Sequence, residues 1–137
     1  MTNRIFFDTS FLYSFIDQKE IHHKSSVKLF DTLKFEDEIL VTSNYIISEL
    51  ITLFRARNFQ LEKIIHFVNN LWNEKYYKVL RVTKEIDLEA WKMMRQYKDQ
   101  DFSFTDCTSF ILMKKNNIKK AFSLDKHFIT AGFELAE

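Results

Sequence analysis

Short apolar runs alternate with longer segments of helical period along the whole chain, and this alternation restricts the fold more than any other feature. Apolar runs of strand length are typical of strands buried in a sheet, and five are indicated: residues 5–7, 39–42, 77–82, 121–124 and 133–135. The segments between the first four runs carry apolar residues at spacings of three and four, as in helices that cover a sheet. Strands that alternate with helices favour a parallel sheet covered on both faces. The pattern therefore predicts one α/β domain over residues 1–137.

The helix limits follow from capping residues. A short helix through Phe15 and Ile16 is predicted after Asp8–Thr9–Ser10, which supply its cap. Further helices are predicted from Ser25 to Leu33, from Asn44 to Arg57, over 60–73, from Thr83 to Tyr97 and from Ser103 to Asn116. The chain has one glycine and no proline. Asn58 is therefore expected to end one of these helices in place of the more usual glycine, and Asn116–Asn117 is expected to close another.

Composition excludes several classes of protein. With 46% hydrophobic and 28% charged residues, the 137-residue chain has the composition of a globular domain. Its net charge of +1 argues against a uniformly basic nucleic-acid binder. A single cysteine excludes an intrachain disulfide and suits a reducing compartment. The apolar N-terminal segment is short and interrupted by Asp8 and Asp17, so a cytoplasmic protein without a membrane span is expected.

Four acids occupy corresponding places in this pattern. Asp8 follows the first predicted strand, and Asp125 follows the fourth. Glu49 lies in the first two turns of the helix after the second strand, and Asp106 lies in the first turn of its helix. Because chemistry in a parallel α/β sheet gathers outside the carboxyl ends of the strands, these four side chains are expected to converge.

Each acid also has a structural explanation. Asp8 could cap the first helix, Asp125 could be a turn residue, and Asp106 completes a capping box with Ser103. Glu49 is harder to explain in this way, because its helix is apolar nearly all round. We expect Glu49 to be largely buried, without a lysine or arginine three or four residues later to neutralise it.

Together the four carboxylates would repel one another unless a cation held them. Hard oxygen ligands of this kind select Mg²⁺ or Mn²⁺. The four histidines show no zinc-ligand spacing with Cys107. The sequence thus predicts a divalent-metal site formed by Asp8, Glu49, Asp106 and Asp125.

These residues stand in a pattern that resembles the PIN-domain nucleases and, among them, the VapC-type toxins of bacterial toxin–antitoxin pairs. The resemblance rests on FFDTSFLYSFID, on Ser48–Glu49, on DQDFSFTDCTSFILMKK and on AFSLDKHFITAGFEL. It implies a PIN-like three-layer α/β/α sandwich with a central, mainly parallel sheet of four to five strands. It also implies an endoribonuclease that hydrolyses RNA phosphodiester bonds with Mg²⁺ or Mn²⁺.

The resemblance assigns roles residue by residue. Asp8 and Asp106 would be inner metal ligands, and Glu49 and Asp125 would complete the coordination or act through water. Ser10 and Thr105 fall on positions that support the metal site or bind substrate. Asp99 and Asp101 occupy a loop where family members often carry an extra acid.

Partners are less well defined by the residues themselves. Lys114 and Lys115 are candidates for RNA contacts, although a solvated helix end explains them as well. The resemblance implies a homodimer and a small antitoxin that covers the active-site groove. Two alternatives stay open: a PIN nuclease of RNA processing or quality control without an antitoxin, and a non-catalytic module that binds RNA or protein.

Overall fold

The computed structural model describes residues 3–34, 37–73 and 77–136 and contains one five-stranded sheet. Every neighbouring pair of strands is parallel, and the strand order is β3-β2-β1-β4-β5. The predicted parallel sheet is therefore confirmed, with strand ends that differ from the prediction by at most two residues. The strands are β1 (Asn3–Phe7), β2 (Glu38–Ser43), β3 (Tyr77–Leu80), β4 (Lys120–Phe122) and β5 (Glu134–Leu135).

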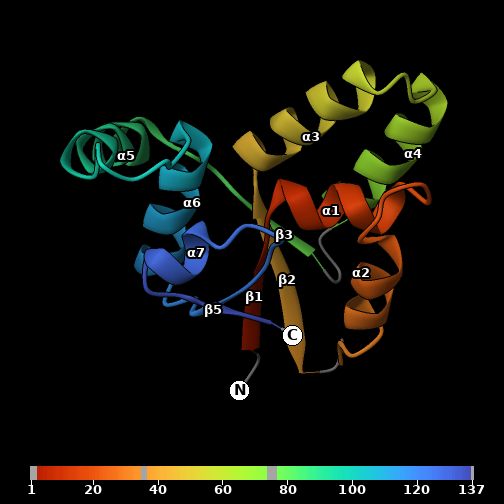
Figure 1. Ribbon diagram of the computed structural model, residues 1–137, viewed down its shortest axis with the longest axis horizontal. Helices are drawn as coiled ribbons and strands as arrows, with labels where there is room; N and C mark the ends of the chain where they lie inside the picture. The colour runs from red at the N-terminus through yellow and green to blue at the C-terminus, as the bar shows by residue number, and fades with distance from the viewer. Residues whose placement is uncertain (1–2, 35–36, 74–76, 137) are drawn as a thin grey trace.

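Helices cover both faces of this sheet, which confirms the three-layer arrangement. In Figure 1, α1 to α4 lie on one side of the strands and α5 to α7 on the other. Right-handed crossovers produce this division, because the chain runs outward from β1 to β3 and then returns to β4 on the opposite side of β1. The helices are α1 (Thr9–Ile16), α2 (His23–Phe30), α3 (Asn44–Ala56), α4 (Leu61–Trp72), α5 (Lys84–Gln96), α6 (Phe104–Lys115) and α7 (His127–Thr130).

The core between sheet and helices is built largely from phenylalanine. Phe7 of β1 stacks on Phe122 of β4 with ring centroids 5.0 Å apart, and Phe11 of α1 packs on the same ring at 4.9 Å. On the other face, Phe110 of α6 contacts Phe128 of α7 edge to face at 5.0 Å. The first two contacts fix α1 against β1 and β4, and the third joins α6 to α7 on the opposite face. None of the helices among the described residues is long and apolar enough to cross a membrane.

Asparagine replaces glycine at two helix ends, as predicted for Asn58, and the helix predicted to close at Asn116–Asn117 ends with Asn117 in this role. Asn58 and Asn117 adopt the left-handed conformation, with φ of 61° and 54°. After each, the next backbone N–H donates to a carbonyl five residues earlier: Phe59 to Phe54 at 3.0 Å and Ile118 to Met113 at 2.8 Å. This closing pattern satisfies carbonyls that the helix leaves free, so α3 and α6 end sharply without glycine.

The strand order places a topological switch between β1 and β4. Phe7 and Phe122, the last residues of the two strands, stand side by side in the register. The chain leaves β1 toward one face of the sheet and leaves β4 toward the other. Such a point is the usual binding crevice of an open α/β sheet. Asp8 and Asp125 both emerge there.

Candidate metal centre

Asp8 lies at the carboxyl end of β1, and its side chain faces the site and does not cap α1. It occupies the N-cap position of α1, but its carboxylate makes no capping hydrogen bond. Instead its Oδ2 accepts hydrogen bonds from Ser10 Oγ and from Ser123 Oγ, both at 2.9 Å. Only 5% of the side chain is exposed. Two hydroxyls therefore hold Asp8 through one oxygen, and no hydrogen bond among the described residues occupies Oδ1.

Asp8 is costly to ionise without a cation. Its pKa is raised to about 6, mainly by burial and also by the negative charges of Asp106 and Glu49, against the lowering effect of the hydrogen bonds from Ser123 and Ser10. Asp106 and Glu49 must lie close to Asp8 for their charges to raise its pKa. Asp106 and Glu49 thus lie near Asp8, and the metal site predicted from these acids stays a prediction.

Asp106 forms the helix cap that its spacing from Ser103 indicates, and its carboxylate also faces the other acids of the site. It forms a capping box with Ser103, whose Oγ accepts from the Asp106 backbone N–H at 3.0 Å while Asp106 Oδ2 accepts from the Ser103 N–H at 3.1 Å. The same carboxylate lies 3.1 Å from Nδ1 of His127. The cap therefore fixes Asp106 at the start of α6 and turns it toward the end of β4.

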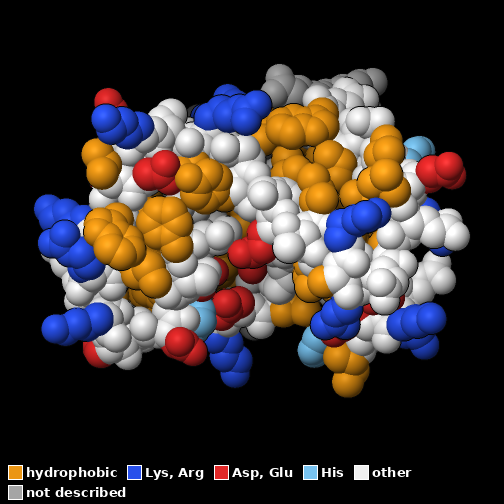
Figure 2. Space-filling view, turned by 90° about the horizontal axis from the view of Figure 1, so that it is seen from above, with side chains coloured by type: hydrophobic (Ala, Val, Ile, Leu, Met, Phe, Trp, Pro, Cys, Tyr) orange, Lys and Arg blue, Asp and Glu red, His pale blue; other side chains and the backbone are white. Residues whose placement is uncertain are grey.

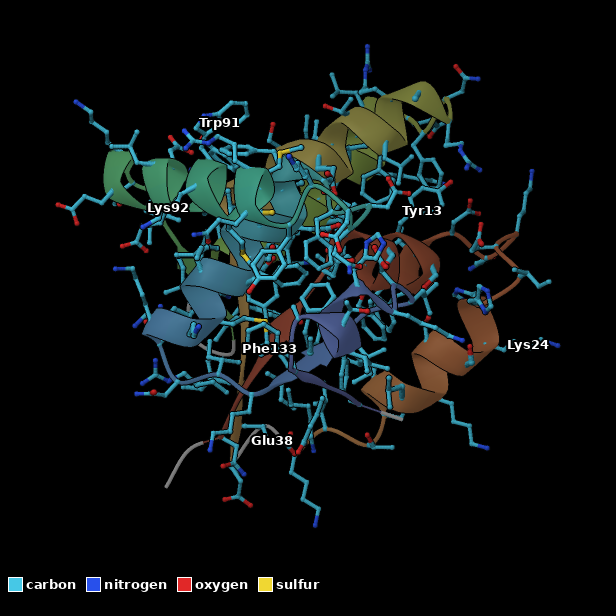
Figure 3. The ribbon with its side chains drawn as sticks, turned by 60° about the vertical axis from the view of Figure 1, so that its left-hand side comes forward. Tyr13, Lys24, Glu38, Trp91, Lys92 and Phe133 are labelled. Atoms are coloured by element: carbon cyan, nitrogen blue, oxygen red, sulfur yellow. The ribbon has the colours of Figure 1, made fainter. Side chains whose placement is uncertain are left out.

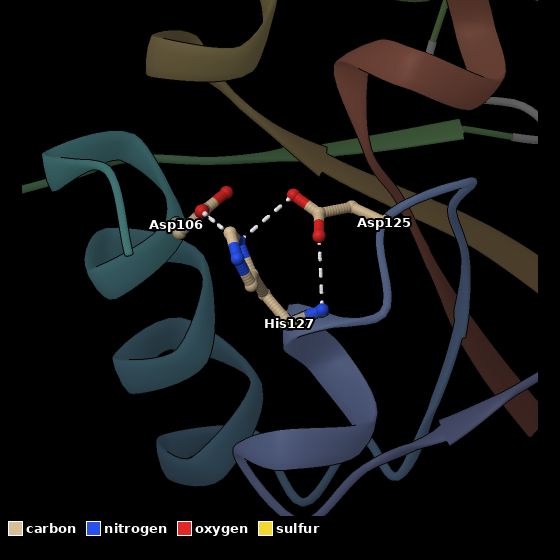
Figure 4. Close-up of side chains that lie close together, drawn as sticks. All are labelled: Asp106, Asp125 and His127. Carbon is tan, nitrogen blue, oxygen red and sulfur yellow. Dashed lines mark hydrogen bonds and ion pairs between the residues drawn. The ribbon is translucent and has the colours of Figure 1, made fainter. Parts of the chain in front are cut away.

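Asp125 is held by the residue two positions after it. The backbone N–H of His127 donates to Asp125 Oδ1 at 2.9 Å, and His127 Nδ1 lies 3.1 Å from Asp125 Oδ2. The His127 ring thus stands between Asp125 and Asp106 (Figure 4). One ligand atom from each of the three residues lies within 4.8 Å of the other two. These contacts bring the first turn of α6 and the loop after β4 together.

Two residues at the site were not predicted from the sequence. The sequence shows no zinc-ligand spacing between His127 and Cys107, so no role was predicted for His127. Its position two residues after Asp125 is the signal that could have indicated one. Ser123 was assigned to the fourth strand, but β4 ends at Phe122 and the Ser123 hydroxyl bonds to Asp8. Burial alone would lower the pKa of His127. Its hydrogen bond with Asp106 and the charges of Asp125, Asp106 and Asp101 raise that pKa.

Glu49 corrects one prediction. The expectation that it is largely buried was wrong, because its side chain is exposed. The helix is amphipathic after all: α3 buries one face, and Glu49 lies outside that face with the exposed residues Ser48 and Thr52. Glu49 nevertheless raises the pKa of Asp8, so it borders the site from the solvent side. The buried residues of α3 are Ile46, Ile47, Leu50 and Phe54.

The structure distinguishes among the predicted supporting residues. Ser10 bonds to Asp8 and lies 3.2 Å from Ser123 Oγ. Thr105 is partly buried in the first turn of α6, where its carbonyl accepts from Thr108 Oγ1 at 2.7 Å. Asp99 and Asp101 are both exposed, and it is Asp101 whose charge acts on His127.

Lys114 and Lys115 lie at the other end of α6 from the acids. Lys114 is eight residues after Asp106, which corresponds to about 12 Å along a helix. Lys115 forms an ion pair with Glu89 of α5 at 3.1 Å. The predicted RNA-contact residues are therefore separated from the metal centre by most of a helix.

The donor set fits a hard divalent cation. Among the described residues, no lysine or arginine forms an ion pair with Asp8, Glu49, Asp106 or Asp125. Carboxylate oxygens dominate the cluster, which is the chemistry that Mg²⁺ and Mn²⁺ prefer. The residues that could hold the ion are Asp8 and Asp106, with Asp125 and Glu49 beside them.

Comparisons with known proteins agree with this geometry. The model of the PIN domain family matches residues 5–134. The 23S rRNA-specific endonuclease VapC20 of Mycobacterium tuberculosis is 28% identical over 129 residues, which cover 94% of this chain and 95% of that protein. The crystal structure of M. tuberculosis VapC20, described as a sarcin–ricin loop cleaving toxin, superposes with a TM-score of 0.85 at 27% identity, over 94% of this chain and 95% of that one.

A more distant structure shows the same fold. FitAcB from Neisseria gonorrhoeae matches with a TM-score of 0.66 at 16% identity, over 97% of this chain and 96% of that one. The family match covers nearly the whole chain, and the acids lie at the switch point of the sheet. The chain belongs to the PIN domain family of metal-dependent nucleases and is a homologue of the VapC-type endoribonucleases.

Proposed function

We propose that this protein is an endoribonuclease that uses Mg²⁺ or Mn²⁺ to hydrolyse a phosphodiester bond of RNA, and that it acts as the toxin of a toxin–antitoxin pair. The observation that carries the proposal is the convergence of Asp8, Asp106 and Asp125 at the switch point of a PIN fold. The likeness to VapC20 over 94% of the chain adds the reaction class.

The chain's own groups prepare the site for this reaction. Ser10 and Ser123 hold Asp8 through Oδ2 and leave its Oδ1 to bind the cation. The capping box and His127 hold Asp106 through its Oδ2, and no hydrogen bond among the described residues occupies its Oδ1. Asp8 and Asp106 would hold a divalent cation there, which would supply charge stabilisation for the phosphate and activation of water near neutral pH. In this proposal Glu49, on the exposed side, would accept the proton of the attacking water.

The substrate proposed is ribosomal RNA. VapC20 is named as specific for 23S rRNA, and its crystal structure is described as that of a toxin that cleaves the sarcin–ricin loop. An exposed stem-loop suits a site that opens at the edge of a sheet, since unpaired nucleotides can present a phosphate to it. Such a substrate would place the reaction in the cytoplasm.

Lys126 is a better candidate for a phosphate contact than Lys114 or Lys115. It is exposed and lies between Asp125 and His127, at the start of α7. Because Lys126 is next to Asp125 in the chain, its ammonium group can offset the repulsion between the acids and a phosphate. A lysine at the far end of α6 is too distant to offset this repulsion as well.

Exposed apolar side chains support the proposal of protein partners. Figure 2 shows hydrophobic side chains gathered on either side of a central group of acids, over α5 on one side and toward α3 and α4 on the other. Leu88 and Trp91 of α5 are 60% and 52% exposed, and Trp91 lies on the outer side of the molecule (Figure 3). Leu61 and Ile65 of α4 are 53% and 48% exposed. Surfaces of this kind suit a second copy of the chain and an antitoxin.

The proposal is tested by mapping RNA ends after the protein is induced in a bacterial host without an antitoxin. Wild type should stop growth and create new ends at one position in ribosomal RNA, and Asp8→Asn should do neither. Asp99→Asn is the matched control, because Asp99 is an exposed acid of the loop before α6. Equal growth and equal RNA ends for wild type and Asp8→Asn would refute the proposed activity.

A further inference from the structure

A pocket of about 460 Å³ lies between α5, α6 and the turn that follows α7. Sites for small molecules in proteins typically enclose about 300 to 1,000 Å³, so this pocket has the size of such a site. Along α6 it begins at Phe110, one helical turn after Asp106, and extends to Lys114. None of the four acids of the metal centre lines it. The pocket is therefore separate from the metal centre.

The floor of the pocket is apolar and held in place by the turn after α7. Phe133 stacks on Phe110 with ring centroids 5.8 Å apart and 28° between the ring planes, and Met93 of α5 lines the same space. Gly132, the only glycine of the chain, has a φ of 99°, which lets the Phe133 N–H donate to the Phe128 carbonyl at 2.9 Å. A Cβ atom added at Gly132 would have no described atom within 4 Å, so the turn leaves open space there.

Two exposed lysines line the pocket without an acidic partner. Lys92 of α5 and Lys114 of α6 form no ion pair with any residue that the structure describes. Glu89, an acid of the lining, is paired with Lys115 at 3.1 Å. In Figure 3, Lys92 lies on the side of α5 that faces Phe133. The pocket thus combines an apolar floor with unbalanced positive charge at its edge.

We propose that this pocket binds a small amphipathic anion, a molecule with an apolar acyl or aromatic body and a single carboxylate or phosphate group. The body would lie on Phe110 and Phe133, and the anionic group would lie between Lys92 and Lys114. Burial of the apolar body drives such binding, and the ammonium groups select a negative charge. Binding there does not depend on the proposed nuclease reaction.

An RNA strand fits this pocket less well than a small anion does. Single-stranded RNA takes a positively charged groove that follows its backbone, with aromatic rings exposed for stacking. Here two lysines stand beside a single apolar pocket, and Phe110 is only 2% exposed.

The test uses the whole chain and three probes that share one apolar body: octanoate, octyl phosphate and octan-1-ol. Calorimetry should give one bound anion per chain, with octan-1-ol weaker by about tenfold or more. Lys92→Gln combined with Lys114→Gln should weaken both anions by about tenfold and leave octan-1-ol within about twofold. Lys84→Gln combined with Lys98→Gln is the matched control, because it removes two exposed lysines that do not line the pocket. Ala131→Leu should weaken all three probes, because a larger side chain fills the space of the apolar body.

The comparison of octanoate with octyl phosphate assigns the anionic group, and nuclear Overhauser effects from the octyl chain to the rings of Tyr97 and Phe133 should place the probe in the pocket. Circular dichroism and retained binding of octan-1-ol establish that the double lysine variant is folded. No saturable binding of either anion, equal affinity for octan-1-ol, or unchanged anion affinity in the double variant would overturn the proposed site. Displacement of octanoate by a stem-loop RNA would also overturn it, since the pocket would then belong to the RNA-binding surface.

Discussion

Ser123 Oγ donates a hydrogen bond of 2.9 Å to Oδ2 of Asp8, although the two residues are 115 positions apart in the chain. The bond joins the ends of β1 and β4 at the switch point. It also lowers the pKa of Asp8 against the effect of burial. Ser123 therefore helps to keep Asp8 ionised and oriented for a cation.

Ser123→Ala should weaken metal binding. Asp8 would lose one of its two hydroxyl donors, and a hydrogen bond to a charged group contributes about 1.5 kcal/mol or more, so affinity for Mn²⁺ should fall about tenfold. The rising limb of the pH–activity profile should move to higher pH, since Asp8 would hold its proton more tightly. Calorimetry measures the affinity for Mn²⁺ and initial rates measure the pH profile, with Ser25→Ala of α2 as the control. An unchanged affinity in Ser123→Ala would contradict the role given to Ser123.

Asp8 should make the metal-free protein less stable as pH rises. Its pKa is about 6 in the fold against 3.8 ordinarily, so the folded state binds the proton more tightly than the unfolded chain. The stability that this proton provides is fully present below pH 3.8 and is lost as pH rises through about 6, a change of about 3 kcal/mol. Asp8→Asn should therefore exceed wild type in the free energy of unfolding at pH 7.5 and match it near pH 4.

Denaturant titrations in a chelator measure this difference, and Asp99→Asn should follow wild type at both pH values. An Asp8→Asn variant that is no more stable than wild type at pH 7.5 would show that burial of the charge is not costly. Adding Mn²⁺ should raise the stability of wild type at pH 7.5 more than that of Asp8→Asn.

Glu49→Gln should separate function from stability. Because Glu49 is exposed and outside the buried face of α3, its substitution should change the free energy of unfolding by less than about 0.5 kcal/mol. RNA cleavage should nevertheless fall by about 100-fold if the carboxylate accepts a proton from water. Thermal melts and single-turnover rates measure the two effects, with Ser48→Ala as the neighbouring control. Full activity in Glu49→Gln would remove Glu49 from the mechanism.

Lys126→Ala should weaken RNA binding more than Lys114→Ala does. Lys126 lies between two residues of the centre, whereas Lys114 is at the far end of α6. Removing a single phosphate contact should reduce the slope of log affinity against log salt by about 1. Binding of a stem-loop RNA to the Asp8→Asn protein, measured at several salt concentrations, checks this. Equal slopes for the Lys126 and Lys114 variants would argue against the contact.

The sequence predicted the order of elements well because their patterns are local. Leu61, Ile64 and Val68 repeat at the helical period of α4, and Ser103 and Asp106 form the cap that their spacing indicates. Asn58 and Asn117 end helices as glycine would. Helix α7 was missed because a helix of four residues has no period to detect.

The site was harder to predict, since its contacts join distant segments. Asp8, Asp106 and Asp125 could be placed at one sheet edge from their positions after strands and at a helix start. No local pattern shows that Ser123 turns back to Asp8 or that His127 stands between two acids. The prediction that Glu49 is buried was wrong because it rested on the high apolar content of α3. That content does not show which face of the helix each residue occupies.

The most direct measurement of the central claim is cleavage of a ribosomal stem-loop RNA by purified protein with and without divalent metal. We predict cleavage at one position with Mn²⁺ or Mg²⁺ and no cleavage in a chelator. The cleavage rate of Asp106→Asn should be at least 100-fold lower, although its backbone N–H can still donate to the capping residue Ser103. Asp101→Asn, an exposed acid of the preceding loop, should retain cleavage within about tenfold. Cleavage that persists in a chelator, or that Asp106→Asn carries out as fast as wild type, would contradict a metal-dependent ribonuclease centred on these acids.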